Sequence, residues 1–284
     1  MTGPAGAAPR PEPPHDRAAD LERIRRALSA ALEAVRPFTP GDVAWERKEG
    51  RGDPVTEADR AIDDVLRETL PDAGEGWLSE ESVDDPERLR RGRVWVVDPI
   101  DGTREFIDGV PEWCVSIGLL EDGEPVAGGI LNPATGERIL GALGAGVTYR
   151  PAAGEPDRPA AVRAEPRERP HVLASRTEIR RGAWDRFGDR YRVEPCGSVA
   201  YKLARVAAGL ADATWTLSPK NEWDVAGGAA LVRAGGGIVR LADGRHPRFN
   251  QRDPLLTGLV AAHAGLVARI LADLEALGGG KARA

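Results

Sequence analysis

Apolar residues near the start of the chain recur at intervals of three or four, which is the spacing of one face of an α-helix. They are Leu21, Ile24, Leu28, Leu32 and Val35. This spacing predicts a helix over residues 17–36, ended by Pro37. The next periodic run opens with Thr56-Glu57-Ala58-Asp59, which resembles a capping box, and predicts a second helix that stops at Pro71.

After Pro71 the helical spacing gives way to short apolar runs that are typical of strands. These runs predict strands at residues 76–78, 93–97, 113–120 and 125–131, and one or two more within residues 137–149. The polar segment Glu121-Asp122-Gly123-Glu124 joins two of the runs and indicates a β-hairpin.

The second half of the chain alternates between strand and helix patterns, which predicts an α/β fold. Strands are expected at residues 171–174, 213–215, 237–241 and 256–261, and helices at residues 198–209, 223–234 and 264–277. The stretch 151–170 is rich in Pro, Ala, Glu and Arg and marks a candidate boundary. We therefore expect an N-terminal α+β subdomain at 17–155 and a C-terminal α/β subdomain at 156–277, with disordered tails at 1–16 and 278–284.

The charge balance narrows the range of partners. The 284 residues include 39 Lys and Arg against 45 Asp and Glu, a formal net charge of −6. Nucleic acid is an unexpected partner, because no excess of cations exists to replace its counterions. No apolar run approaches the roughly 18 residues of a membrane span, and the first residues lack the apolar core of a signal peptide. We expect a cytoplasmic protein in which Cys114 and Cys196 are buried free thiols.

The strongest candidate for chemistry is the segment Asp98-Pro99-Ile100-Asp101-Gly102-Thr103, directly after the apolar run 93–97. Two carboxylates on one turn repel each other unless a cation lies between them, and Mg²⁺ prefers hard oxygen ligands. The carbonyl of Ile100 offers another oxygen. Gly102 lets the backbone approach a phosphate closely, and the helical turn that follows presents free N–H groups to an anion.

Two further acidic sites lie at the edges of expected elements. Glu80 and Glu81 follow the strand at 76–78, and Asp224 lies in the first turn of the helix at 223–234. By residue type alone, each also fits an ordinary role, since carboxylates are common in solvated turns and at helix N-termini. These positions are therefore suggestive only in combination.

In combination, four motifs resemble those of the inositol monophosphatase superfamily of lithium-sensitive, Mg²⁺-dependent phosphatases. In chain order they are Asp53-Pro54-Val55-Thr56-Glu57-Ala58-Asp59, Ser79-Glu80-Glu81-Ser82, Asp98-Pro99-Ile100-Asp101-Gly102-Thr103 and Trp223-Asp224-Val225-Ala226-Gly227. The resemblance runs from about Lys48 to about Ala262 and implies a layered αβαβα sandwich and a homodimer. The chain departs from the common form at Ser79, where the family usually has Gly.

The resemblance also implies a set of metal ligands. Glu80, Asp98 and the carbonyl of Ile100 would hold one metal ion. Asp98, Asp101 and Asp224 would hold a second, so that Asp98 bridges the two ions. Two or three Mg²⁺ are expected in each site. The N-terminal subdomain would carry most of the metal ligands, and the C-terminal subdomain would carry Asp224 and contacts to the substrate.

Three more residues receive roles from the same resemblance. Asp59 would hydrogen-bond Thr103, and Thr103 together with Glu80 would position the water that attacks the phosphate. No phosphoenzyme is expected, because a metal-activated water is an adequate nucleophile. Lys48 lies where the family often has a lysine near the metals.

The expected substrate is a small phosphate monoester, and the 3'(2'),5'-bisphosphate nucleotidase branch, acting on 3'-phosphoadenosine 5'-phosphate, is the first candidate. In that branch a basic residue and Glu-Phe follow the metal motif, as Arg104-Glu105-Phe106 do here. The residues expected to contact substrate are Asp101, Gly102, Thr103, Arg104, Gly197, Ser198 and Asp224.

A negative feature agrees with the nucleotidase branch. Inositol phosphatases usually carry a Glu seven residues before the last metal ligand, where it contacts ring hydroxyls, and this chain has Leu217 there. An apolar side chain cannot accept a hydrogen bond from a hydroxyl. Arg104, Arg176 and Lys220 are available to bind a second phosphate instead.

Two alternatives stay open. The first is hydrolysis of inositol 1-phosphate or histidinol phosphate. The second, from a different class, is a regulatory protein that keeps the fold but binds RNA polymerase or RNA. The complete ligand set argues against an inactive enzyme, and the acidic balance argues against RNA.

Overall fold

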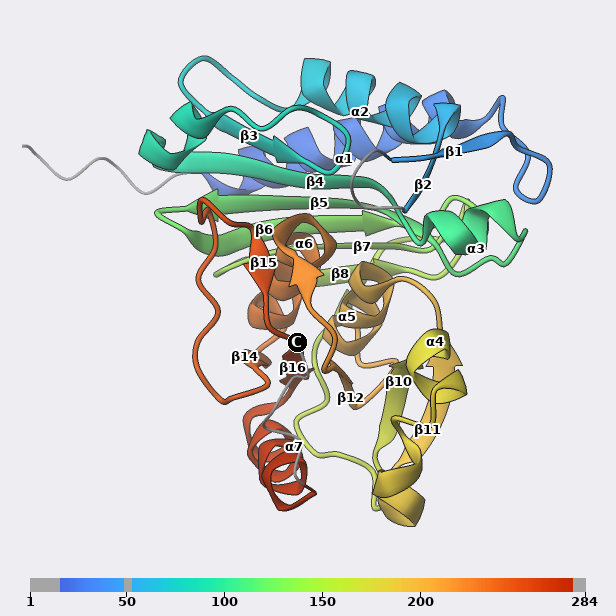
Figure 1. Cartoon of the computed structure of the whole chain (residues 1–284). Helices are drawn as coiled ribbons and strands as arrows, with labels where there is room; N and C mark the ends of the chain where they lie inside the picture. Colours follow the sequence, from blue (N-terminus) through green and yellow to red (C-terminus); the bar gives the residue numbers. More distant parts are fainter. Residues whose placement is uncertain (1–15, 49–52, 278–284) are drawn as a thin grey trace, which may run out of the picture.

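The computed structural model describes residues 16–48 and 53–277, and its elements form five layers (Figure 1). Helices α1 (Arg17–Val35) and α2 (Glu57–Thr69) cover one face of a seven-stranded sheet. Helices α5 (Val199–Ala207) and α6 (Glu222–Ala234) lie between this sheet and a five-stranded sheet, whose outer face is covered by α7 (Ala264–Ala276). The expected αβαβα sandwich is confirmed.

The seven-stranded sheet follows the chain in the order β3-β4-β5-β6-β7-β8-β9. Its first two strands are parallel and the others pair antiparallel. The strands are β3 (Gly76–Ser79), β4 (Arg93–Asp101), β5 (Cys114–Glu121), β6 (Glu124–Leu131), β7 (Arg138–Ala142), β8 (Gly146–Arg150) and β9 (Arg158–Ala160). The predicted hairpin joins β5 to β6 through Asp122 and Gly123, whose φ angles of 49° and 77° match the twist that such a turn requires.

The five-stranded sheet is mixed and has the order β11-β10-β12-β16-β14. Its strands are β10 (His171–Ser175), β11 (Arg192–Cys196), β12 (Ala213–Thr216), β14 (Ile238–Leu241) and β16 (Leu259–Ala262). The single strand expected at 256–261 is divided into β15 (Leu255–Leu256), which pairs with β13 (Lys220–Asn221), and β16. Gly258, at a φ of 85°, lies between them and turns the chain where other residues would be strained.

Short elements complete the fold. Strands β1 (Trp45–Arg47) and β2 (Pro54–Thr56) form a two-stranded sheet, and α3 (Thr103–Ile107) and α4 (Arg176–Arg180) are single helical turns. Two 3₁₀ segments span Pro86–Arg90 and Asp185–Arg190. The sequence patterns did not predict α4, which proves to carry a side chain of the site.

Strand β4 shows how the layers are held together. Val94 and Val96 are buried in the apolar core that surrounds α5 and α6, whereas Trp95 and Val97 are buried in the core beneath α1 and α2. Successive side chains of a strand point to opposite faces, so a strand covered on both sides is apolar throughout. A third core, on the outer face of the five-stranded sheet, lies under α7.

Several smaller expectations can be compared with this structure. Cys114 and Cys196 are both buried and free, as expected. Thr56 and Asp59 form the predicted capping box at the start of α2. The tails for which we expected disorder lie outside the described residues, except for Asp16, which accepts a hydrogen bond from Ala18 N and caps α1. Among the described helices, none has both the length and the apolar character needed to cross a membrane.

Candidate metal and phosphate site

Three carboxylates from distant parts of the chain meet at one point. Glu80 follows β3, Asp98 lies in β4, and Asp224 lies in the first turn of α6. Each offers an oxygen within 4.8 Å of the oxygens of the other two. All three line a cleft of about 400 Å³ that is bordered by both sheets' connecting segments. The first requirement for a shared cation, convergence of hard oxygen ligands, is therefore met.

Strand β4 is longer than its apolar run predicts and includes both aspartates. Its pairing with β5 shifts register between Asp98 and Asp101, at the position of Pro99. Proline cannot donate to the ladder, and such bulges re-aim the side chains that follow. Gly102, at a φ of 100°, then turns the chain into α3, and a side chain there would press on Trp113. The local sequence thus explains how two nearby carboxylates face one cleft.

Burial makes the negative charge of these carboxylates unfavourable. Burial, followed by the charges of Glu80, Asp101 and Asp224, raises the pKa of Asp98 well above its usual range. Burial and the charge of Asp101 likewise raise the pKa of Asp224 to about 8. Both pKa shifts have the same cause: several buried carboxylates lie close together with too few cations to balance their charge.

The site residues fit a hard divalent cation. Asp98 is 1% exposed, and its Oδ1 atom is buried without a hydrogen-bond partner in the described part of the chain. Buried polar atoms are nearly always satisfied, so an orphaned carboxylate oxygen indicates a missing partner. Mg²⁺ would supply that partner and offset the charge of the neighbouring carboxylates.

Asp101 contributes charge to the cluster but is held by other groups. Its Oδ2 accepts hydrogen bonds from Ser198 Oγ at 2.6 Å and from Ala200 N at 2.5 Å, at the start of α5. Ser198 has a φ of 50°, a conformation that costs a non-glycine residue about 1 to 3 kcal/mol. Strain of this kind is found where surrounding contacts impose it, and here Asp101 and Tyr201 N both bond the Ser198 hydroxyl.

Lys48 contacts one carboxylate of the cluster directly. Its Nζ atom donates to Glu80 Oε1 and to Glu81 Oε1, each at 2.6 Å. Ser79, which stands where the family usually has Gly, makes two hydrogen bonds. Its hydroxyl donates to Asp63 at 2.5 Å and accepts from Glu81 N at 3.2 Å. These bonds fix the turn that carries Glu80.

The expected pair of Asp59 and Thr103 is present but loose. Thr103 Oγ1 lies 3.4 Å from Asp59 Oδ1 and 3.0 Å from the carbonyl oxygen of Ile100. The other oxygen of Asp59 accepts from Thr56 Oγ1 at 2.6 Å and from Thr56 N at 2.7 Å. Burial raises the pKa of Asp59 to about 6 despite these bonds.

Two groups that the sequence offers to a substrate are engaged within the protein. The N–H of Gly197 donates to Glu112 Oε2 at 2.7 Å, and Arg176 forms a two-pronged pair with the same carboxylate at 2.7 and 2.5 Å. Arg104 lies at the exposed rim and pairs with Asp53 at 3.3 Å. Lys220 also lines the cleft, and within the described residues it forms no ion pair.

Sequence reasoning missed two buried charged residues of the cleft, Glu178 in α4 and Lys202 in α5. A signal for the first existed, because Ser175-Arg176-Thr177-Glu178 has the spacing of a capping box. Ser175 does cap α4, with Glu178 N at 3.5 Å from its hydroxyl, but the Glu178 side chain turns to the cleft instead of closing the box. Lys202 carried no signal, since its helical position alone does not distinguish it from a surface lysine.

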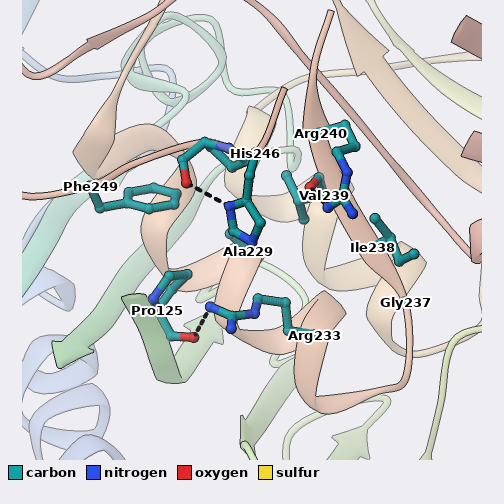
Figure 2. Close-up of a pocket in the computed structure, with 10 residues that line it drawn as sticks. Pro125, Ala229, Arg233, Gly237, Ile238, Val239, Arg240, His246 and Phe249 are labelled. Atoms are coloured by element: carbon teal, nitrogen blue, oxygen red, sulfur yellow. Dashed lines mark hydrogen bonds between the residues drawn. The ribbon is translucent and has the colours of Figure 1, made fainter. Parts of the chain in front are cut away.

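A smaller cavity, of about 120 Å³, shares no lining residue with this cleft (Figure 2 shows its lining). Its polar side chains are committed to neighbours: Arg233 donates to the carbonyl of Pro125 at 3.0 Å, and the His246 ring bonds the carbonyl of Pro247 at 2.9 Å. Among the described residues, no carboxylate lines it. The cleft at Asp98 is therefore the better candidate for chemistry.

Comparison with known proteins agrees with this geometry. The family model of the inositol monophosphatase family matches residues 16–278. An inositol-1-monophosphatase of Mesorhizobium japonicum is 32% identical over 261 residues, covering 87% of this chain and 92% of the relative. A 3'-phosphoadenosine 5'-phosphate phosphatase of Mycobacterium leprae is 31% identical over 270 residues, covering 85% and 92%.

The fold has close counterparts among solved structures. An inositol monophosphatase from Anabaena superimposes with a TM-score of 0.75 at 24% sequence identity, over 92% of this chain and 96% of the other. At that identity the match supports the fold alone. The family model and the two curated relatives extend the likeness to the sequence of nearly the whole chain.

Proposed function

Because the chain belongs to the inositol monophosphatase family of metal-dependent phosphatases, we propose that it hydrolyses the phosphate monoester of a small hydroxyl-rich metabolite, with inositol 1-phosphate as the first candidate. The observation that carries the proposal is the convergence of Glu80, Asp98 and Asp224 within 4.8 Å, with Asp98 Oδ1 left unpartnered. Such a cluster is costly in a protein that has no use for a cation.

In this proposal the carboxylates hold Mg²⁺. Glu80, Asp98 and the carbonyl of Ile100 would be the ligands of one ion, and Asp98, Asp101 and Asp224 would be those of another. When bound, Mg²⁺ neutralises charge on the phosphoryl oxygens and makes water more acidic. The protein's own part is to place the phosphate and the water in line, which supplies most of the catalysis in phosphoryl transfer.

Thr103 and Asp59 orient the attacking water. Thr103 is the first residue of α3, and its Oγ1 is within reach of both Asp59 and the backbone carbonyl of Ile100. Its hydroxyl can therefore pass a hydrogen bond from the water towards the buried carboxylate, while Glu80 accepts a second one. Water adds to phosphorus as the ester oxygen leaves, and the products are the alcohol and inorganic phosphate. No covalent enzyme intermediate forms.

A second candidate is hydrolysis of 3'-phosphoadenosine 5'-phosphate, supported by the M. leprae relative and by two cations of the cleft. Lys220 and Arg181 have no ion-pair partner among the residues that the structure describes. They are suited to a second phosphate, whereas Arg176 is already paired with Glu112. Sequence motifs favour this candidate, and the inositol-named relative of similar identity supports the first.

The test is phosphate release with Mg²⁺ from inositol 1-phosphate, 3'-phosphoadenosine 5'-phosphate and histidinol phosphate, compared as kcat/KM. We expect hydrolysis that stops when Mg²⁺ is chelated and that is fastest for inositol 1-phosphate. Fastest hydrolysis of the bisphosphate would establish the second candidate. No release from any of the three esters would overturn the phosphatase function. The homodimer implied by the family stays a prediction that sedimentation can check.

A further inference from the structure

Two buried charged residues line the catalytic cleft without a part in the proposed chemistry. Glu178 comes from α4 and Lys202 from α5, and both lie in the wall formed by the five-stranded sheet and its connections. They are 9% and 4% exposed, respectively. Buried charges are normally paired with each other or with opposite charges nearby. Within the described residues these two form no ion pair with each other or with any other group.

Glu178 is held rigidly by neutral donors. Its Oε1 accepts from Thr216 Oγ1 at 2.5 Å and from Ser218 Oγ at 3.0 Å, and its Oε2 is 3.4 Å from Trp184 Nε1. A carboxylate has about four lone-pair positions, and the contact with Trp184 is long. Oε2 therefore keeps capacity to accept another hydrogen bond.

Lys202 has donors to spare. Its ammonium group carries three N–H bonds, and its hydrogen bond within the structure runs to the carbonyl of Cys196 at 3.3 Å. Burial lowers the pKa of Lys202, and the negative charge of Glu178 is among those that oppose this shift. Both side chains line the same cleft, and no ion pair joins them within the described residues.

We propose that Glu178 and Lys202 form a subsite that binds one hydroxyl group of the substrate. This inference rests on the proposed phosphatase function. A hydroxyl can accept a hydrogen bond from Lys202 and donate one to Glu178, so it satisfies both groups at once. A phosphate group only accepts, and it would be repelled by the Glu178 carboxylate. The pair therefore selects a hydroxyl-bearing ester over one with a second phosphate at this place.

The subsite would provide a carboxylate for a substrate hydroxyl although residue 217 is an apolar Leu. That side chain packs against the outer core under α7 and does not line the cleft. Its neighbours Thr216 and Ser218 do line the cleft, and their hydroxyls hold Glu178 in place. The acid that the sequence lacks at residue 217 is thus supplied from α4.

The experiment compares two esters, inositol 1-phosphate and phenyl phosphate, which has no hydroxyl group, in wild type and variants. In Glu178→Gln the amide oxygen stays on Thr216 and Ser218, and the NH₂ group replaces Oε2. We expect the kcat/KM ratio of inositol 1-phosphate to phenyl phosphate to fall about 10- to 100-fold, the effect of leaving a buried polar group unpaired. Lys202→Met should lower the same ratio. The double variant should lose less than the two single effects combined, because both residues bind one hydroxyl.

Glu137→Gln is the matched control. Glu137 is also 9% exposed and also held by two hydroxyls, those of Tyr149 and Tyr201, but it does not line the cleft. We expect it to change thermal stability and leave the ratio of the two esters within about twofold.

Several results would overturn the subsite. They are a wild-type ratio near one, an equal loss on both esters in Glu178→Gln, or a Lys202→Met variant impaired only on 3'-phosphoadenosine 5'-phosphate. The last would show a second-phosphate site. Failure of the phosphatase function itself looks different, since wild type would then release phosphate from neither ester in the presence of Mg²⁺.

Discussion

The two ends of strand β4 hold two groups of carboxylates with opposite environments. At its start lies the paired cluster, in which Asp20, Glu75 and Glu121 are bonded by Arg17, Arg23 and Arg93. At its end lies the open cluster of Glu80, Asp98 and Asp224, which Lys48 contacts only at Glu80. One strand thus carries two kinds of cluster. The charges of the paired cluster are balanced and stabilise the fold, whereas the carboxylates of the open cluster repel each other and destabilise it.

The size of a cavity does not separate these two regions. The cleft beside the paired cluster measures about 650 Å³ and that beside the open cluster about 400 Å³. Charge satisfaction does separate them. Bonds from Arg23 and Arg93 lower the pKa of Glu75 to about 2 against the effect of its burial, whereas burial and neighbouring carboxylates raise the pKa of Asp224 to about 8. Unbalanced charge, more than cavity volume, marks a binding site in this molecule.

The largest expected effect is that of Asp98→Asn in the open cluster. We expect phosphatase activity to fall on the order of 10³-fold, since the carboxylate proposed as a ligand of both ions is lost. Without Mg²⁺ the variant should unfold at the same temperature as wild type or higher, because one uncompensated buried charge has been removed. Phosphate release and thermal unfolding measure the two effects. Retention of most of the activity would refute the metal assignment.

Mg²⁺ should stabilise the protein through the open cluster alone. At a concentration 100 times the dissociation constant, a ligand of the folded state adds about 2.7 kcal/mol. For a chain of this size we expect the unfolding midpoint to rise by about 5 °C or more. Asp98→Asn should lose this shift and Glu75→Gln should keep it. A shift of equal size in both variants would place the ion elsewhere.

Glu75→Gln should have the opposite effects to Asp98→Asn: it should lower the stability of the protein and leave its activity unchanged. It weakens bonds to Arg23, Arg93 and Trp95, and we expect a loss of about 2 kcal/mol of unfolding free energy at neutral pH, allowing for solvent screening. Its kcat with saturating Mg²⁺ should match that of wild type. Urea unfolding gives the first quantity and phosphate release the second. A variant as stable as wild type would show that the paired cluster contributes nothing.

The difference in unfolding free energy between wild type and Glu75→Gln should depend on pH. The pKa of Glu75 is lowered from its usual value of 4.5 to about 2 in the folded state. Its contribution is therefore fully present above about 4.5 and is lost as the pH falls towards 2. The stability gap between wild type and Glu75→Gln should stay constant from neutral pH to about 4.5 and narrow below it. Urea unfolding at several pH values would contradict this if the gap widened in acid.

The smallest effect is expected for Ser79→Gly, which restores the residue common in the family. The change removes the bonds that join Ser79 to Asp63 and to Glu81 N, and so loosens the turn that carries Glu80. We expect the Mg²⁺ concentration for half-maximal activity to rise about threefold to tenfold, with kcat unchanged at saturation. Titration of activity with Mg²⁺ measures both. An unchanged half-saturation would leave Ser79 with a purely local role.

Much of the fold and of the open cluster could be predicted from the sequence, because the signals are local. The spacing of Ile24 and Leu28, the capping box at Thr56 and the turn at Gly123 each depend on residues within one or two turns of each other. The four motifs identified the family and named Glu80, Asp98 and Asp224 as neighbours. These three carboxylates converge because the ends of two strands and the start of one helix face the same cleft.

The sequence alone determined the layered fold, the family and the acidic end of the cleft. Tertiary structure alone decided which charges are satisfied. Arg176 and Gly197, which the sequence offered to a substrate, are bonded to Glu112 instead, and Glu178 from α4 lines the cleft where Leu217 does not. The reason is physical: whether a charged side chain is paired depends on groups brought from distant positions, and no local spacing encodes those distances.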